Sequence, residues 1–213
     1  MKLFYKENQI EAGIDEVARG CLFGRVYTAA VIWPEENDPD IFHPIMKDSK
    51  KLSKTRREIM AEYVKANAID YSVSFCSSDI IDDINILQAT YKSMHQSLNG
   101  LNVDFDQIIV DGSNFKPYIS RHGDYVPHKC FAQGDTKFYS IAAASILAKV
   151  EHDKYIKELC EQYPELDDKY GLLSNMGYGT QTHMDGIIEN SITQWHRKEF
   201  GICKEYVNQV QTI

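Results

Sequence analysis

The segment from Ser140 to Leu159 constrains the fold most, because its pattern predicts a long helix that needs a flat surface to pack on. Small side chains crowd its first turns, namely Ala142, Ala143, Ala144 and Ser145. A face this small allows a helix to approach a β-sheet closely. The segment therefore predicts a helix lying against a sheet, and the remaining sequence has to supply the strands.

Short apolar runs supply them. Residues 10–15 and 26–33 read as two strands joined by a glycine-containing turn, which predicts a hairpin. Residues 69–75 alternate like a half-buried strand, residues 107–110 read as a buried strand, and residues 128–132 as a weaker one. Helical patterns separate these runs. They lie after Ser53, which is a plausible N-cap, along the stripe Ile84, Leu87, Tyr91, Met94 and Leu98 up to Asn99-Gly100, after Thr180, and after Trp195. This order predicts an α/β domain with a mixed central sheet flanked by helices and a helical C-terminal segment.

Length and composition are those of a globular protein. The chain has 213 residues, of which 43% are apolar, so we expect a single domain over 1–213 with a C-terminal helical extension from about 180. No apolar run approaches the ~20 residues that cross a bilayer, and the N-terminus has no signal-peptide core, so we expect a cytoplasmic protein without a membrane partner. The five scattered cysteines are expected to be reduced thiols.

Charge is unevenly distributed. The net charge of −8 argues mildly against a nucleic-acid partner. Six basic residues nevertheless lie between Lys47 and Arg57, against the single acid Asp48. This basic run is either a solvated loop and helix start or a rim that contacts phosphates.

Three acidic sites share one context, because each follows an apolar strand. Asp15 and Glu16 end the first strand, Asp111 ends a central one, and Asp135 follows the last strand before the long helix. Each could be an ordinary turn residue. Ligands of α/β sheets gather at strand ends, however, so the four carboxylates are expected to converge on one metal site. Hard oxygen donors suit Mg²⁺ or Mn²⁺, and paired ions roughly 4 Å apart cleave phosphodiesters.

Seven blocks then occur in an order that resembles type 2 ribonucleases H. They are GIDEVARG at 13–20, DSKKLS at 48–53, VDG at 110–112, GDTK at 134–137, SIAAASILAKV at 140–150, GYGTQTH at 177–183 and WHRKEF at 195–200. The match covers nearly the whole chain, and the joint pattern is specific where no single block is. An arginine at position 19 favours type 2 over type 3.

The resemblance implies an RNase H-like fold. It also implies cleavage of the RNA strand of RNA–DNA hybrids and incision 5′ of single ribonucleotides embedded in duplex DNA, giving 3′-OH and 5′-phosphate ends. By motif, Asp15, Glu16, Asp111 and Asp135 would be the catalytic, metal-binding tetrad for two Mg²⁺ or Mn²⁺ ions. The loop Ala18-Arg19-Gly20 would sense the ribose 2′-OH, the group that distinguishes RNA from DNA. Tyr178 would act at the same junction, and Asp48, Ser49 and Lys50 would contact backbone phosphates.

The chain departs from the family pattern at Ala18, where a glycine is usual. We expect a negative φ there and retained activity, since a positive φ would cost an alanine about 1 kcal/mol or more.

Several residues keep two readings. His183 and His196 are expected to be structural hydrogen-bonding residues rather than site residues. Arg197 and Lys198 contact phosphate or are surface charges, and Lys149 points to the site or to the helix exterior. The tail, residues 207–213, lacks the paired aromatics of a sliding-clamp-binding peptide, so we expect no such partner and a monomer.

Two other functions compete with a ribonuclease H. One is another two-metal DNA nuclease or resolvase on the same fold, and the other is an inactive RNase H-fold binding protein. The first has no use for a ribose-sensing loop. An intact tetrad argues against the second, because clustered carboxylates without metal would destabilise the fold.

Overall fold

A computed structural model of the chain describes residues 1–34 and 53–213. A five-stranded sheet forms its centre, in the order β3-β2-β1-β4-β7. These strands are β1 (Glu11–Val17), β2 (Val26–Ile32), β3 (Asp70–Cys76), β4 (Gln107–Asp111) and β7 (His128–Phe131). β1 pairs antiparallel with β2 and parallel with β4, so the sheet is mixed as expected and the predicted hairpin is confirmed.

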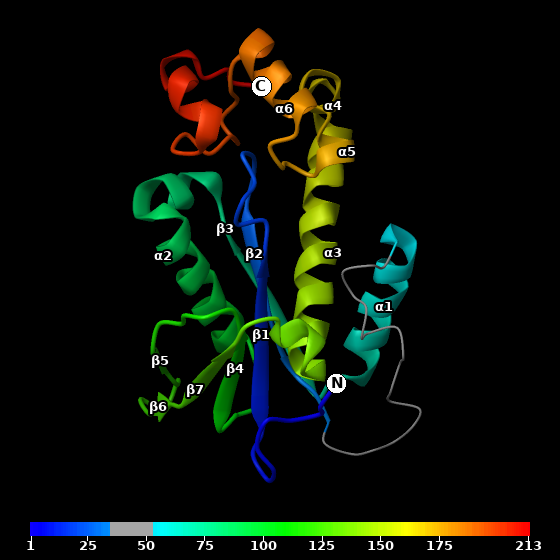
Figure 1. Ribbon diagram of the computed structural model, residues 1–213, viewed down its shortest axis with the longest axis vertical. Helices are drawn as coiled ribbons and strands as arrows, with labels where there is room; N and C mark the ends of the chain where they lie inside the picture. Colours follow the sequence, from blue (N-terminus) through cyan, green and yellow to red (C-terminus); the bar gives the residue numbers. More distant parts are fainter. Residues whose placement is uncertain (35–52) are drawn as a thin grey trace.

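Helices cover both faces of the sheet (Figure 1). On one face lie α3 (Tyr139–Gln162) and α1 (Lys54–Asn67), and on the other lies α2 (Ser78–Asn99). The long helix begins and ends within three residues of its predicted bounds, and Ala142, Ala143 and Ala144 are fully buried. The α/β architecture with a mixed sheet is therefore the one that the sequence predicted.

Gly13 allows α3 to approach β1. A Cβ atom built at Gly13 would lie 2.4 Å from the Ser140 hydroxyl oxygen and 2.5 Å from the Ser140 carbonyl carbon. Real side chains do not tolerate such contacts with backbone, so only glycine lets the first turn of α3 rest on this strand.

The stripe expected along α2 is buried only in part. Met94 and Leu98 are buried, but Leu87 is 41% exposed. Leu87 lies outside the buried face of the second half of α2, which also includes Ala89, Ser93 and Ser97. The helix is kinked before this half, at Asn85, where φ is 63° and ψ is 163° and the side-chain Oδ1 accepts hydrogen bonds from the N–H groups of Leu87 and Gln88.

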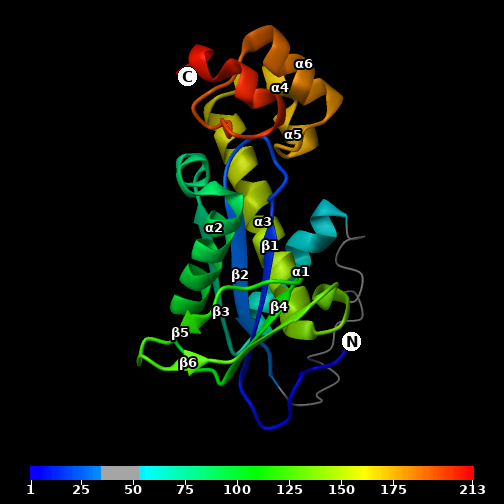
Figure 2. The ribbon, with the colours of Figure 1, turned by 60° about the vertical axis from the view of Figure 1, so that its left-hand side comes forward.

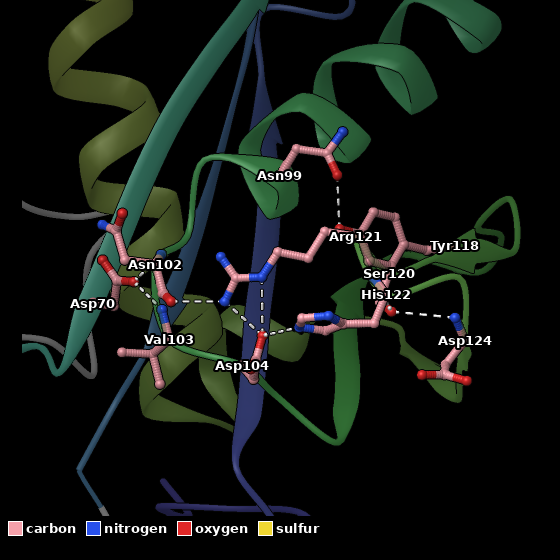
Figure 3. Close-up of polar contacts among 10 residues, drawn as sticks. All are labelled: Asp70, Asn99, Asn102, Val103, Asp104, Tyr118, Ser120, Arg121, His122 and Asp124. Carbon is pink, nitrogen blue, oxygen red and sulfur yellow. Dashed lines mark hydrogen bonds and ion pairs between the residues drawn. The ribbon is translucent and has the colours of Figure 1, made fainter.

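A small hairpin closes the N-terminal end of β4, opposite Asp111. It consists of β5 (Tyr118–Ile119) and β6 (Tyr125–Val126). Arg121 donates two hydrogen bonds to one oxygen of Asp104, and His122 Nε2 lies 3.3 Å from the same oxygen (Figure 3). The hydrogen bond from Arg121 lowers the pKa of Asp104. All three side chains are exposed, so this cluster anchors the hairpin rather than forming a buried site.

Short helices gather at the far end of α3 (Figure 2). They are α4 (Glu165–Tyr170), α5 (Leu172–Asn175), α6 (Gln181–Asn190) and the 3₁₀ helix η4 (Gly201–Gln209), and we call residues 165–213 the C-terminal cap. Helical structure thus begins before the expected position near 180, and the segment after Trp195 forms a 3₁₀ helix. The helix after Thr180 is confirmed, with the Thr180 hydroxyl accepting from the His183 N–H. The division into one domain plus an extension stays a prediction.

Two further expectations concern the cysteines and membrane-spanning helices. Four of the five cysteines are buried, and all five are free thiols. Within the described residues, no helix is both long and apolar enough to span a bilayer.

Candidate active site

Strand register brings two carboxylates together at one end of the sheet. Ile14 of β1 pairs with Val110 of β4, and the next residue on each strand is Asp15 or Asp111. Ile14 and Val110 pack into the core under α2, so the residues that follow them face α3. The alternation that buries the strands therefore also aims both carboxylates at the same side.

These carboxylates line an open cavity of about 300 Å³. Its walls are formed by Asp15, Glu16, Val17, Arg57, Asp111, Ser145, Ile146, Lys149 and Tyr178. Asp135 does not line it. This residue is 1% exposed within the 3₁₀ helix η3 (Gly134–Thr136), and the preceding Gly134 N–H donates to Asp111 Oδ1 at 2.6 Å. The structure thus brings three of the four predicted carboxylates to one cavity and places the fourth outside its lining, next to the residue whose N–H bonds Asp111.

The carboxylates repel one another. Burial raises the pKa of Asp15 well above its ordinary value, and the charges of Glu16 and Asp111 raise it further. Burial also raises the pKa of Glu16, against the opposing hydrogen bond from Arg19. Clustered acids of this kind are stabilised by a cation, so the donor set fits a divalent metal ion. In residues 1–34 and 53–213, no three histidine, cysteine or carboxylate side chains stand close enough to enclose an ion. Mg²⁺ does not need a closed cage, because it keeps several waters when bound.

Two basic side chains, Lys149 and Arg57, also line the cavity and form its basic wall. Lys149 Nζ lies 3.0 Å from Asp153 Oδ1, and Arg57 Nη1 lies 3.3 Å from Asp153 Oδ2. Burial alone would raise the pKa of Asp153, but hydrogen bonds with His152 and Lys149 lower it, so this carboxylate stays charged and holds both cations. Of the two readings of Lys149, the structure supports the one that points to the site. Arg57 shows that at least one residue of the basic run reaches the cavity.

Tyr178 completes the cavity from the C-terminal cap. Its ring lies 5.6 Å from Lys149 Nζ, and the backbone of Ala18 is near enough to the Tyr178 hydroxyl to oppose the effect of burial on the pKa of Tyr178. Burial and the neighbouring Cys21 raise the pKa of Tyr178 to about 12, so its hydroxyl keeps its proton at neutral pH. The tyrosine is 38% exposed and therefore open to a ligand.

The loop after β1 corrects one expectation. Ala18 has φ of 69°, so the prediction of a negative φ is wrong. This alanine is 2% exposed and occupies the left-handed region that glycine usually fills, at a cost of about 1–2 kcal/mol. The surrounding contacts outweigh that cost, since the Cys21 N–H donates to the Ala18 carbonyl and Cys21 itself forms a β-bridge with Tyr178. These contacts are tertiary, so the sequence alone does not predict that they hold Ala18 at a positive φ.

Arg19 and Gly20 lie beside the cavity. Arg19 Nη1 is 3.1 Å from Glu16 Oε1, and the arginine side chain is 47% exposed. No atom lies within 4 Å of a Cβ built on Gly20. The predicted phosphate contacts Asp48, Ser49 and Lys50 lie outside the described residues.

Comparison with known proteins identifies the family of this chain. A sequence profile of the family "Ribonuclease HII" matches residues 12–203. The chain belongs to the ribonuclease HII family. A ribonuclease HII of Parabacteroides distasonis is 41% identical over 206 residues, which is 96% of this chain and 97% of the relative. The chain is accordingly a ribonuclease H, an enzyme class that cleaves RNA in RNA–DNA hybrids.

Solved structures show the same fold. The crystal structure of ribonuclease H2 from Pyrococcus horikoshii OT3 aligns with a TM-score of 0.76 and 22% identity, covering 93% of this chain and 97% of that one. A Bst-RNase HIII solved in complex with Mn²⁺ aligns with a TM-score of 0.67 and 18% identity, covering 93% of this chain and 69% of that one. The predicted RNase H-like fold is confirmed.

The structure also corrects the interpretation of Arg197. Arg197 was expected either to contact phosphate or to lie on the surface, and both readings are wrong, because its side chain is fully buried. His183 and His196 are also fully buried, with their Nε2 atoms 3.2 Å apart, which confirms that they are structural hydrogen-bonding residues. The block around residues 195–200 marked this region, but only the fold shows what these side chains contact.

Proposed function

We propose that this enzyme cleaves RNA–DNA hybrids and incises 5′ of single ribonucleotides embedded in duplex DNA, giving 3′-OH and 5′-phosphate ends. One observation carries the proposal. A single cavity joins a carboxylate wall, a basic wall and Tyr178 next to a loop that offers backbone groups. Such a cavity can meet a metal-bound phosphodiester and the adjacent ribose at the same time.

The proposed metal ligands are Asp15, Glu16, Asp111 and Asp135. The raised pKa of Asp15 supports this, because a divalent cation would relieve the repulsion that raises it. Two Mg²⁺ or Mn²⁺ ions would activate a water molecule and stabilise the leaving oxygen. Asp135 would join from next to Asp111, to which the neighbouring Gly134 is already bonded. The Mn²⁺ in the Bst-RNase HIII structure supports ions of this type.

The ribose would be read by the loop and the tyrosine together. The hydroxyl of Tyr178 keeps its proton at neutral pH and lies at the Ala18 backbone, so both offer hydrogen bonds to a 2′-OH in one place. Lys149 and Arg57 would hold the phosphate, since both line the cavity and Asp153 fixes their charged ends. Asp48, Ser49 and Lys50 are proposed to extend these contacts along the backbone.

A matched set of duplexes tests the proposal. One duplex carries a single ribonucleotide, a second is identical but all DNA, and a third is an RNA–DNA hybrid, each assayed with Mg²⁺, with Mn²⁺ and with a chelator. We expect cleavage of the first and third only, 5′ of the ribonucleotide in the first, and none with the chelator. Equal cleavage of the all-DNA duplex would instead indicate a general two-metal DNA nuclease, and no cleavage of any duplex would indicate a binding protein.

Tyr178→Phe tests the ribose contact within that assay. Loss of the hydroxyl should lower kcat/KM on the single-ribonucleotide duplex by roughly tenfold, the size of one charged or well-placed hydrogen bond. Tyr125→Phe is the matched control, because Tyr125 is 55% exposed on the distant hairpin. Equal effects of the two substitutions would contradict a role for Tyr178.

A further inference from the structure

We propose that His183, His196 and Arg197 are positioning residues for ribonucleotide recognition. Their hydrogen bonds fix the main chain at Tyr178 and Arg19. This inference rests on the proposed function, which assigns Tyr178 and the Ala18–Gly20 loop to the ribose. All three residues are 0% exposed, and none lines the cavity. They can therefore affect the substrate only through the backbone groups that they contact.

Arg197 holds the recognition loop from beneath. Its Nη1 donates to the Arg19 carbonyl at 3.1 Å, Nε to the Gly24 carbonyl at 2.9 Å, and Nη2 to the Arg25 carbonyl at 3.0 Å. A guanidinium is a rigid planar fork, so these bonds fix the start of the loop relative to its end at β2. Burial lowers the pKa of Arg197 to about 10, and the group therefore stays charged at neutral pH.

The two histidines hold Tyr178 through one defined proton arrangement. The Thr193 N–H donates to His196 Nδ1 at 2.9 Å, so the proton of neutral His196 is on Nε2. That nitrogen lies 3.2 Å from His183 Nε2, which must then accept. The proton of His183 is consequently on Nδ1, which lies 3.0 Å from the Tyr178 carbonyl oxygen. The chain of bonds from Thr193 to Tyr178 is satisfied only with both rings neutral.

The two supports meet at the proposed ribose site. Cys21 and Tyr178 form an antiparallel β-bridge, and the Leu22 N–H donates to the Gly177 carbonyl at 2.9 Å. The loop held by Arg197 is thus bonded to the segment held by the histidines. Because His196 and Arg197 are consecutive, one short stretch of the C-terminal cap fixes both halves of the recognition site.

Stability alone does not explain these residues. Burying a guanidinium and two imidazoles carries a desolvation cost, and apolar side chains of similar volume fill such space without that cost. What apolar residues cannot do is fix the carbonyl groups of Arg19 and Tyr178 in one place. Positioning therefore accounts for the choice of polar residues.

A double-variant cycle on the single-ribonucleotide duplex tests the inference. Wild type, Tyr178→Phe, His183→Leu and the double variant are compared by kcat and KM with Mg²⁺. We expect His183→Leu to lower kcat by roughly tenfold to a hundredfold, as small displacements of a reacting group do. Once Tyr178 is displaced, removal of its hydroxyl should cost little more, so the double variant should lie within about twofold of His183→Leu. Independent, additive losses would overturn the inference.

Two further variants separate positioning from general structural damage. His183→Asn keeps an N–H donor near the Nδ1 position and should recover most of the lost kcat. Ile192→Val, in the same buried core, is the structural control and should lower the melting temperature without changing kcat. Failure of His183→Asn to recover activity, or an equal loss in Ile192→Val, would count against positioning. If His183→Leu does not fold by circular dichroism, the same cycle with Arg197→Lys decides.

The outcomes also distinguish this inference from the proposed function. If Tyr178→Phe slows cleavage and the cycle is additive, only the positioning role fails. If Tyr178→Phe has no effect in the wild-type background, the ribose role of Tyr178 fails, and the positioning role with it.

Discussion

The two walls of the cavity are built in different ways. The carboxylate wall comes from strand ends, where Asp15 and Asp111 follow paired residues of neighbouring strands. By the recognition wall we mean Tyr178, which lines the cavity, together with residues 18–20 beside it. These two segments lie about 160 positions apart in the chain and are joined through backbone contacts supported by buried side chains. The first wall depends on sheet register, whereas the second depends on the packing of the C-terminal cap. We therefore expect some substitutions to abolish cleavage of every substrate and others to impair only the recognition of ribonucleotides.

The largest expected effect is on the carboxylate wall. Asp15→Asn should lower the rate of cleavage roughly a thousandfold or more on every substrate, because a metal ligand contributes several kcal/mol to the transition state. The same variant should be at least as stable as wild type in urea with a chelator present, since it removes a buried charge beside Glu16 and Asp111. Retained activity would show that this wall is not catalytic, and reduced stability would show that its charges are already compensated.

A smaller effect is expected where α3 rests on β1. Gly13→Ala should lower the free energy of unfolding by about 1–3 kcal/mol, because the new methyl group meets the backbone of Ser140. Urea denaturation measures the loss. Gly20→Ala is the control, since nothing lies within 4 Å of its Cβ, and it should leave stability almost unchanged. Equal effects would mean that the close approach of helix and strand is not needed.

The neutral histidine pair that supports the recognition wall should make the stability of the protein depend on pH. Burial lowers the pKa of His183, and burial together with the charge of His183 lowers that of His196 well below its ordinary value. The unfolded chain therefore binds more protons below about pH 6.5, and stability is lost as the pH falls through that value. Between pH 7.5 and 5.5 we expect a loss of at most about 1.4 kcal/mol for each histidine, the limit that holds when the folded ring stays neutral. Denaturation of His183→Leu at both pH values should show a smaller decrease, and an unchanged decrease would contradict the neutral pair.

The smallest effect is expected at Ala18. Ala18→Gly should raise the free energy of unfolding by less than about 1 kcal/mol, because relief of the left-handed alanine is partly offset by greater freedom of the unfolded chain. Thermal denaturation measures the change, and cleavage of the single-ribonucleotide duplex should persist. A decrease in stability would mean that the alanine methyl group packs better than its backbone is strained.

The difference between the carboxylate wall and the recognition wall also explains what could be predicted from sequence. Strand ends follow from local patterns, so the mixed sheet, the long helix and the positions of Asp15 and Asp111 were predictable. The recognition wall was predictable only through resemblance, because no local pattern tells whether an arginine such as Arg197 is exposed or buried. The φ of Ala18 depends on contacts of its loop with neighbouring residues, and the kink of α2 comes from the non-helical backbone at Asn85. These features depend on tertiary contacts that periodicity does not describe.

The acceptors of Arg197 have a consequence for how this enzyme can diverge. They are main-chain carbonyl groups, which every amino acid carries, so exchanging the Arg19 side chain leaves that support in place. Substitutions that retune substrate preference should therefore accumulate on the loop, while Arg197 and the histidine pair stay fixed. In a library selected for cleavage of altered sugars, we expect tolerated changes at residues 18–20 and almost none at 196 and 197. Because Arg197 bonds the loop through its main-chain atoms, the loop side chains can change substrate preference without any change in Arg197.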